Sequence, residues 1–132
     1  MILFIDTTAF FALLDQDDVH HRKAKAQWVD LLASENVFVT TNYILVECFA
    51  LIQHRLGMEA VRAFQDDILP LVRVEWVDAE THKSGVSAFF AASRRKLSLV
   101  DCVSFETMRC LGIKAAFTFD PHFSEQGFSS IS

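Results

Sequence analysis

The sequence opens with Met1-Ile2-Leu3-Phe4-Ile5-Asp6-Thr7-Thr8, a run of large apolar residues that ends abruptly at an acid. A strand that is apolar at every position, without alternation, is one covered on both faces, as in a parallel sheet between helices. In such sheets the reactive crevice lies outside the carboxyl ends of the strands. The run therefore predicts a buried strand over residues 2–5 that places Asp6 at a functional edge.

The composition is that of a well-packed globular chain. Of the 132 residues, 52% are hydrophobic and 13 are Phe, which is enough for a core without disulfides or a structural metal. We therefore expect a single domain over residues 1–132. Cys48, Cys102 and Cys110 are unevenly spaced and flanked by core-type residues, as reduced thiols are. With neither a signal peptide nor a membrane-spanning apolar run visible, we expect a cytoplasmic protein without a membrane partner.

Helical periodicity and capping residues alternate with short apolar runs along the rest of the chain. This βαβ rhythm, without repeats or linkers, predicts an α/β fold with a mostly parallel central sheet flanked by helices. The expected helices are 10–14 (capped by Thr7 or Thr8), about 19–33, 43–56, 58–68, a helix from Asp78 or Thr81 to Arg94-Arg95-Lys96, 99–110, and a short turn from Pro121. The expected further strands are 37–39, 71–77, 115–119 and 128–131.

Four acids fall at corresponding places in this pattern. Asp6 and Asp120 follow predicted strands, and Glu47 and Asp101 lie in the first or second turn of predicted helices. Because helices that follow parallel strands begin at the edge where those strands end, the four carboxylates are expected to converge in one acidic pocket. Taken singly, each has an ordinary explanation as a helix cap or a turn former.

A cluster of carboxylates needs a counterion, since like charges this close do not all stay ionised. Mg²⁺ and Mn²⁺ prefer oxygen ligands, and bound there they acidify a water for attack on a phosphodiester. The pattern therefore predicts metal-assisted phosphodiester hydrolysis. Thr7, Thr118 and Ser104 are candidates to orient the carboxylates by hydrogen bonding, with local capping as the alternative. His122 is near Asp120, where it could contact substrate, but a surface role is the expectation for it.

The net charge of −5 argues against a protein that grips nucleic acid mainly through Lys and Arg. It does not exclude nucleic acid, because a metal held by the acids makes that patch locally positive.

The segments F-I-D-T-T at 4–8, V-E-C at 46–48, L-S-L-V-D-C-V-S-F at 97–105 and T-F-D-P-H-F at 118–123 resemble the PIN domain. More narrowly, they resemble the VapC-type toxins of type II toxin–antitoxin pairs, over essentially the whole chain and in the right order. The resemblance implies a Mg²⁺- or Mn²⁺-dependent endoribonuclease. In it, Asp6, Glu47, Asp101 and Asp120 stand at the family's acidic quartet, with Asp6 and Asp101 as the foremost direct metal ligands.

The resemblance also implies supporting hydroxyls at Thr7 and Thr118, a homodimer, and a cognate antitoxin whose tail covers the acidic groove. An RNA-contacting patch is expected at Arg94, Arg95 and Lys96, with an alternative at Arg22, Lys23 and Lys25. For either patch, a solvated face is the competing interpretation.

Three other functions fit parts of the pattern. One is a PIN nuclease of RNA processing without an antitoxin, which the small size and absence of added domains disfavour. Another is a non-catalytic acidic domain stabilised by metal, which the intact quartet disfavours. A haloacid-dehalogenase-type phosphatase is discarded because it requires a second Asp where Thr8 stands.

Overall fold

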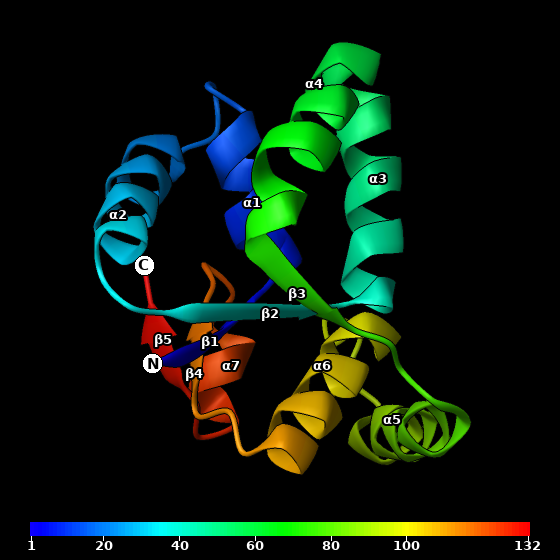
Figure 1. The fold of residues 1–132 in the computed structure, drawn as a ribbon. Helices are drawn as coiled ribbons and strands as arrows, with labels where there is room; N and C mark the ends of the chain where they lie inside the picture. Colours follow the sequence, from blue (N-terminus) through cyan, green and yellow to red (C-terminus); the bar gives the residue numbers. More distant parts are fainter.

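A computed structural model describes residues 1–132 as a five-stranded sheet with helices on both faces (Figure 1). The strands are β1 Ile2–Ile5, β2 Val37–Thr41, β3 Val72–Glu75, β4 Ala115–Phe117 and β5 Ser129–Ile131. The helices are α1 Thr7–Leu14, α2 His21–Ala33, α3 Asn42–Leu56, α4 Met58–Ala63, α5 Ala79–Ala92, α6 Leu99–Leu111 and α7 His122–Glu125; a π-helical turn (Phe64–Ile68) and a 3₁₀ turn (Leu69–Leu71) follow α4.

The sheet has the order β3-β2-β1-β4-β5, and every neighbouring pair is parallel. The chain steps outward from β1 to β2 and β3, then crosses back to β4 on the other side of β1. Because such crossovers are right-handed, the reversal moves the helices to the opposite face. Figure 1 shows α1–α4 above the sheet and α5–α7 below it. The predicted α/β class is confirmed, and the sheet is wholly parallel.

Each face of the sheet has its own aromatic cluster. On the side of α1–α4, Phe64 packs edge-on against Phe10 and Phe49, with ring centroids 5.2 and 5.4 Å away. On the opposite side, Phe123 of α7 contacts Phe4 of β1 and Phe105 of α6. Leu3, Phe4 and Ile5 are fully buried, because β1 is covered from both sides. This core fixes the edge at which β1 and β4 end.

Several boundaries differ from the sequence-based expectations. Helix α1 begins at Thr7 with Asp6 in the N-cap position, so Thr7 and Thr8 lie inside the helix and do not cap it. Strand β4 ends at Phe117, two residues before the predicted end, and the Thr118 side chain that follows hydrogen-bonds Asp6. Pro70 lies within the 3₁₀ turn, so the helical segment continues past the predicted stop.

The connection from α5 to α6 also differs. Helix α5 ends at Ala92 and Ser93 adopts a left-handed conformation, so Arg94, Arg95 and Lys96 lie in the loop after the helix and do not form its last turn. No helix has the length and apolar character to cross a membrane.

Candidate active site

The sheet reverses its winding direction between β1 and β4, and a crevice opens at the carboxyl ends of strands on either side of such a point. Asp6 directly follows β1, and Asp120 lies three residues beyond the end of β4. Helix α6 runs back toward the start of β4, so its N-terminal turn, with Asp101, lies at the same edge. Three acids from distant parts of the chain are therefore brought to the switch point of the sheet.

Asp6 is the most deeply buried of these acids, with 3% of its surface exposed. Its Oδ2 accepts hydrogen bonds from the hydroxyls of Thr8 (2.8 Å) and Thr118 (3.0 Å). Burial raises the pKa of Asp6 to about 6; the two hydroxyls oppose that shift, and the charges of Asp101 and Asp120 add to it. Because burial disfavours the charged form of this carboxyl group, a cation bound nearby would stabilise it as the anion.

Asp101 has a structural role in addition to its place in the crevice. Its Oδ2 accepts a hydrogen bond from the backbone N–H of Ser98 (3.0 Å), and its own N–H donates to Ser98 Oγ (3.1 Å). This reciprocal pair is the capping box that begins α6. Burial, followed by the charge of Asp120, raises the pKa of Asp101 despite the bonds from Ser98.

Asp120 is held by the turn that follows β4. Its backbone N–H donates to Thr118 Oγ1 (2.9 Å), and its Oδ1 accepts from the N–H of His122 (2.9 Å). The Nδ1 atom of His122 lies 2.8 Å from the same Oδ1, without the alignment of a hydrogen bond. Thr118 therefore ties Asp6 and Asp120 together through one hydroxyl.

The three aspartates share one pattern of hydrogen bonding. In each, the protein's donors bind a single carboxylate oxygen, Oδ2 of Asp6 and Asp101 and Oδ1 of Asp120. The second oxygen of each accepts no hydrogen bond from the protein. Ligand atoms of Asp101, Asp120 and His122 lie within 4.8 Å of one another, and the Nδ1 atom of His122 is buried without a hydrogen bond. This oxygen-rich donor set fits a hard divalent cation.

Asp6 and Glu47 both lie outside the group formed by Asp101, Asp120 and His122, but only Asp6 is connected to it, through the Thr118 hydroxyl. Glu47 lies half-buried on α3 and lines a cavity of about 500 Å³ together with Val100, the neighbour of Asp101. The charges that raise the pKa of Asp6 are those of Asp101 and Asp120. The structure thus places Asp6 where it feels the charges of Asp101 and Asp120, and places Glu47 in a cavity that none of these aspartates lines.

The predicted supporting residues divide between two outcomes. Thr118 bonds Asp6, whereas the buried hydroxyl of Thr7 makes no hydrogen bond to any of the acids and lies near the Cys48 thiol. Ser104 is wrong as a partner of the acids: its hydroxyl donates to the Val100 carbonyl (2.9 Å) one turn back in α6.

Sequence reasoning missed two residues of the crevice. Thr8 binds Asp6, whereas its sequence position indicated only a helix cap. His122 was expected at the surface, yet 13% of its side chain is exposed and it lies against Asp120. The signal was the two-residue Asp-Pro-His spacing, which lets an Asp accept the N–H two residues on.

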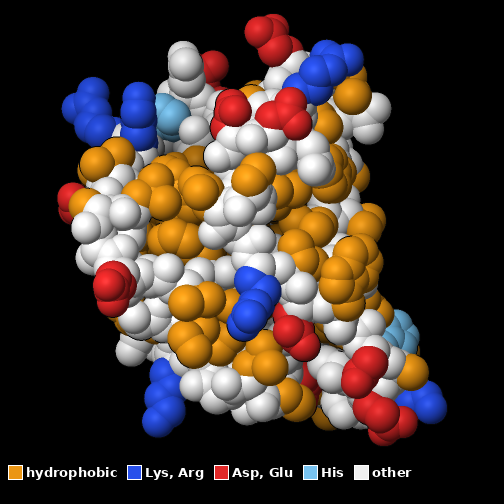
Figure 2. Space-filling model, viewed as in Figure 1, with side chains coloured by type: hydrophobic (Ala, Val, Ile, Leu, Met, Phe, Trp, Pro, Cys, Tyr) orange, Lys and Arg blue, Asp and Glu red, His pale blue; other side chains and the backbone are white.

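The two predicted basic patches have different surroundings. Arg94 forms an ion pair with Glu125 of α7 (3.1 Å), and Arg95 and Lys96 follow it in the loop before α6. Arg22, Lys23 and Lys25 are exposed on α2 and form no ion pair. Figure 2 shows Lys and Arg atoms gathered at the upper left, over the N-terminal end of α2.

Comparison with known proteins agrees with this fold. A model of the PIN domain matches residues 3–129, and the chain therefore belongs to the PIN domain family. Within that family it is a VapC-type endoribonuclease, the toxin class of toxin–antitoxin systems. Over 131 residues it is 34% identical to the 23S rRNA-specific endonuclease VapC20 of two Mycobacterium tuberculosis strains, covering 98% of each chain.

Solved structures give the same result. The crystal structure of M. tuberculosis VapC20, a sarcin–ricin loop cleaving toxin, aligns with a TM-score of 0.87 and 33% identity over 99% of this chain and 98% of that one. Two more distant structures share the fold alone. They are FitAcB from Neisseria gonorrhoeae (TM-score 0.70, 15% identity, 100% and 97% of the chains) and VapBC2 from Rickettsia felis bound to a promoter DNA fragment (0.71, 11%, 99% and 98%).

Proposed function

We propose that the chain cleaves ribosomal RNA with a Mg²⁺ or Mn²⁺ ion held by Asp6, Asp101 and Asp120. The observation that carries this proposal is the shared state of the three aspartates. Each has one oxygen fixed by donors of the protein and a second oxygen that accepts none. If the three aspartates served only as helix caps or turn formers, there would be no reason for them to lie near one another. They come from three separate segments: the end of β1, the start of α6 and the loop after β4.

When bound, the ion supplies a Lewis acid that acidifies water and stabilises negative charge on the scissile phosphate. The chain's own residues prepare the ligands. Thr8 and Thr118 hold Asp6 in one orientation and favour its ionised form, while Ser98 does the same for Asp101. Thr118 also fixes Asp120 through the backbone, so the relative positions of the ligands are set before substrate arrives.

Glu47 and His122 complete the catalytic site in this proposal. Glu47 lines a cavity on α3 beside Val100, the neighbour of Asp101, and its carboxylate would bind substrate or water on that side of the site. His122 holds Asp120 through its backbone N–H and adds a nitrogen donor close to the Asp101 and Asp120 carboxylates. Mn²⁺ accepts a nitrogen donor more readily than Mg²⁺ does. Thr7 and Ser104 act only through local packing.

The proposed substrate is a loop of 23S rRNA. The support is the 34% identity, over 98% of both chains, to a 23S rRNA-specific endonuclease. Loops offer single-stranded, unstacked bases that proteins read, whereas the major groove of paired RNA is too narrow. Arg95 and Lys96, which lie a few residues before Asp101 and form no ion pair, are proposed to hold phosphates on one side of the crevice.

The proposed partners are a second copy of the chain and a cognate antitoxin, in the cytoplasm where the RNA is. Val46, Trp76 and Phe90 are 70–73% exposed, and they are the apolar side chains proposed to be covered in these interfaces. An antitoxin segment that covers the crevice would inhibit the enzyme. We expect such a segment to place a Lys or Arg side chain against the three aspartates.

The test is cleavage of 23S rRNA, and of a mixed RNA pool, by purified protein with Mg²⁺, with Mn²⁺ and with EDTA. Cleavage at a unique rRNA site is expected with metal only, and it should be lost in Asp6→Asn and in Asp101→Asn. Asp67→Asn, an exposed acid on the π-helical turn, is the matched control and should cut at the wild-type rate. Wild-type cleavage by Asp6→Asn would refute the site; cleavage only in the mixed pool would refute the rRNA target.

A further inference from the structure

A second feature lies beside the acidic crevice and is separate from it. The ring of His20, just before α2, stacks on Phe119 in the loop after β4, with centroids 4.4 Å apart and planes within 10°. Phe119 is anchored to the crevice, because its backbone N–H donates to the Thr8 hydroxyl (3.0 Å) that also binds Asp6. His20 is therefore placed next to the catalytic acids through a short chain of fixed contacts.

The stack is supported from beneath and from the side. Phe119 meets Phe117 of β4 edge-on at 6.1 Å, and Phe117 in turn lies parallel to Trp28 of α2 at 6.5 Å. The backbone N–H of His20 donates to Asp18 Oδ1 (2.8 Å), which fixes the turn before the helix. A half-buried ring held in this way is suited to act as a platform for a nucleobase.

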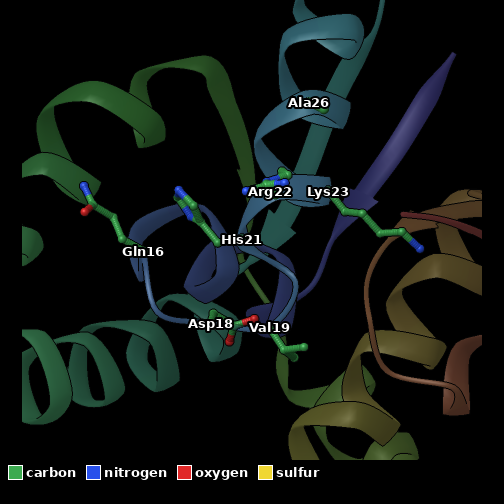
Figure 3. A pocket seen from close by; sticks show the side chains of 7 residues that line it. All are labelled: Gln16, Asp18, Val19, His21, Arg22, Lys23 and Ala26. Atoms are coloured by element: carbon green, nitrogen blue, oxygen red, sulfur yellow. The ribbon is translucent and has the colours of Figure 1, made fainter.

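A basic pocket lies at the start of α2, formed by residues on either side of His20 in the sequence. Figure 3 shows the pocket at the start of α2, where Arg22 and Lys23 extend from the first turn and Asp18 and Val19 come from the preceding turn. Its volume is about 680 Å³. A second pocket of about 560 Å³ shares Arg22 and adds Lys25 and Asp30. In the first pocket two cations face one acid, Asp18, which is already engaged with the His20 backbone, so the pocket favours an anionic group.

We propose that this surface is a nucleotide subsite: His20 stacks on a base flanking the scissile phosphate, and Arg22 and Lys23 bind the adjacent backbone phosphates. The inference deepens the proposed RNA cleavage and rests on it. It assigns part of the substrate path to α2, in addition to the loop with Arg95 and Lys96. The ligand chemistry is single-stranded RNA, because a paired base has no free face for stacking.

The test measures binding without cleavage. Fluorescence anisotropy in EDTA gives the Kd of a dye-labelled, mixed-sequence, single-stranded oligoribonucleotide for wild type and variants. His20→Ala should weaken binding about 10-fold, since loss of one base–aromatic stack has effects of this order. His20→Trp should restore binding, and His54→Ala, an exposed histidine on α3, should change nothing. For an abasic strand of equal charge, which has no base to stack, the Kd of His20→Ala should equal that of wild type.

The cations are tested by salt dependence. Arg22→Ala/Lys23→Ala should reduce the slope of log affinity against log salt by about 1.4, as each lost phosphate contact on a single strand removes about 0.7. Arg62→Ala/Lys83→Ala, exposed cations on α4 and α5, should leave the slope unchanged. Wild-type Kd in His20→Ala, or failure of His20→Trp to restore it, would overturn the subsite.

Failure of the subsite is distinguishable from failure of the proposed function. Metal-dependent rRNA cleavage by wild type is assayed in parallel. If cleavage is intact while the α2 variants bind the oligoribonucleotide as wild type does, only the subsite is wrong. If wild type neither cuts nor binds RNA, both proposals fall.

Discussion

The two carboxylate oxygens of Asp6 have different surroundings. Oδ2 accepts hydrogen bonds from two hydroxyl groups, and the other oxygen accepts no hydrogen bond from the protein. Without a cation, the burial of this group is costly at neutral pH. The stability of the metal-free protein and its catalytic capacity are therefore opposed at a single residue.

Replacement of Asp6 by Asn should stabilise the metal-free protein at pH 7. The pKa of Asp6 is raised from 3.8 to about 6, so the native state holds its proton more tightly than the unfolded state does. Below pH 3.8 both states are protonated and there is no penalty. As pH rises through this window the penalty grows, and above pH 6 it is complete, at about 3 kcal/mol.

The measurement is urea unfolding in EDTA at pH 4 and at pH 7. Asp6→Asn should exceed wild type by up to about 3 kcal/mol at pH 7 and by much less at pH 4. An equal difference at both pH values would show that Asp6 does not titrate as its burial indicates.

Asp101 combines a helix cap with a place in the crevice, and two variants separate these roles. Ser98→Ala removes a hydroxyl acceptor at the start of α6 and should lower the free energy of unfolding by about 1 kcal/mol. It should keep the rise in melting temperature on addition of Mn²⁺. Asp101→Asn should lose that rise. If Mn²⁺ raised the melting temperature of Asp101→Asn as much as that of wild type, Asp101 would be a helix cap and not a metal ligand.

At the scale of elements, α5 and α6 pack closely enough to require a glycine. A Cβ built at Gly85 would lie 2.5 Å from Cγ2 of Val103, which is fully buried, and 3.2 Å from its Cα. Since α6 carries Asp101, this contact also fixes the direction from which that acid enters the crevice.

Gly85→Ala should therefore destabilise the protein by about 1–3 kcal/mol, even though Ala favours a helix more than Gly does. Thermal or urea unfolding measures the change, with Ser87→Ala on the exposed face of α5 as control. Val103→Ala should make the two changes non-additive by relieving the clash. If the free-energy changes of Gly85→Ala and Val103→Ala simply added in the double variant, the clash with Val103 would not be the cause of the destabilisation.

For the whole molecule, the three aspartates make the crevice a point of electrostatic strain that a divalent ion relieves. Mn²⁺ or Mg²⁺ should raise the melting temperature of wild type, by an amount corresponding to about 2.7 kcal/mol at 100 times Kd. The gain should be smaller at pH 5 than at pH 7, because Asp6 must release its proton to bind the ion.

Differential scanning fluorimetry across metal concentrations at both pH values tests this, and EDTA should reverse the effect. Asp67→Asn should respond as wild type does, and Asp6→Asn should respond weakly. If metal did not change the melting temperature at either pH, the three aspartates would not bind a metal ion.

The local sequence determined the order and type of the elements. The uninterrupted apolar run of β1, the helical periodicity of 43–56 and the Ser98–Asp101 capping signal depend on neighbouring residues and on burial, and they were predicted correctly. The meeting of Asp6, Asp101 and Asp120 at one edge was also predictable in outline, because strand ends and helix starts in a parallel sheet face the same way.

Only the tertiary structure decided which side chains touch. Thr8 and not Thr7 binds Asp6, His122 and not Glu47 joins the close group, and His20 meets Phe119 across 99 residues of chain. The physical reason is that a hydrogen bond or a stack depends on side-chain direction to within a fraction of a turn. That direction is set by how the helices pack on the sheet, whereas the pattern of the chain specifies only that they pack.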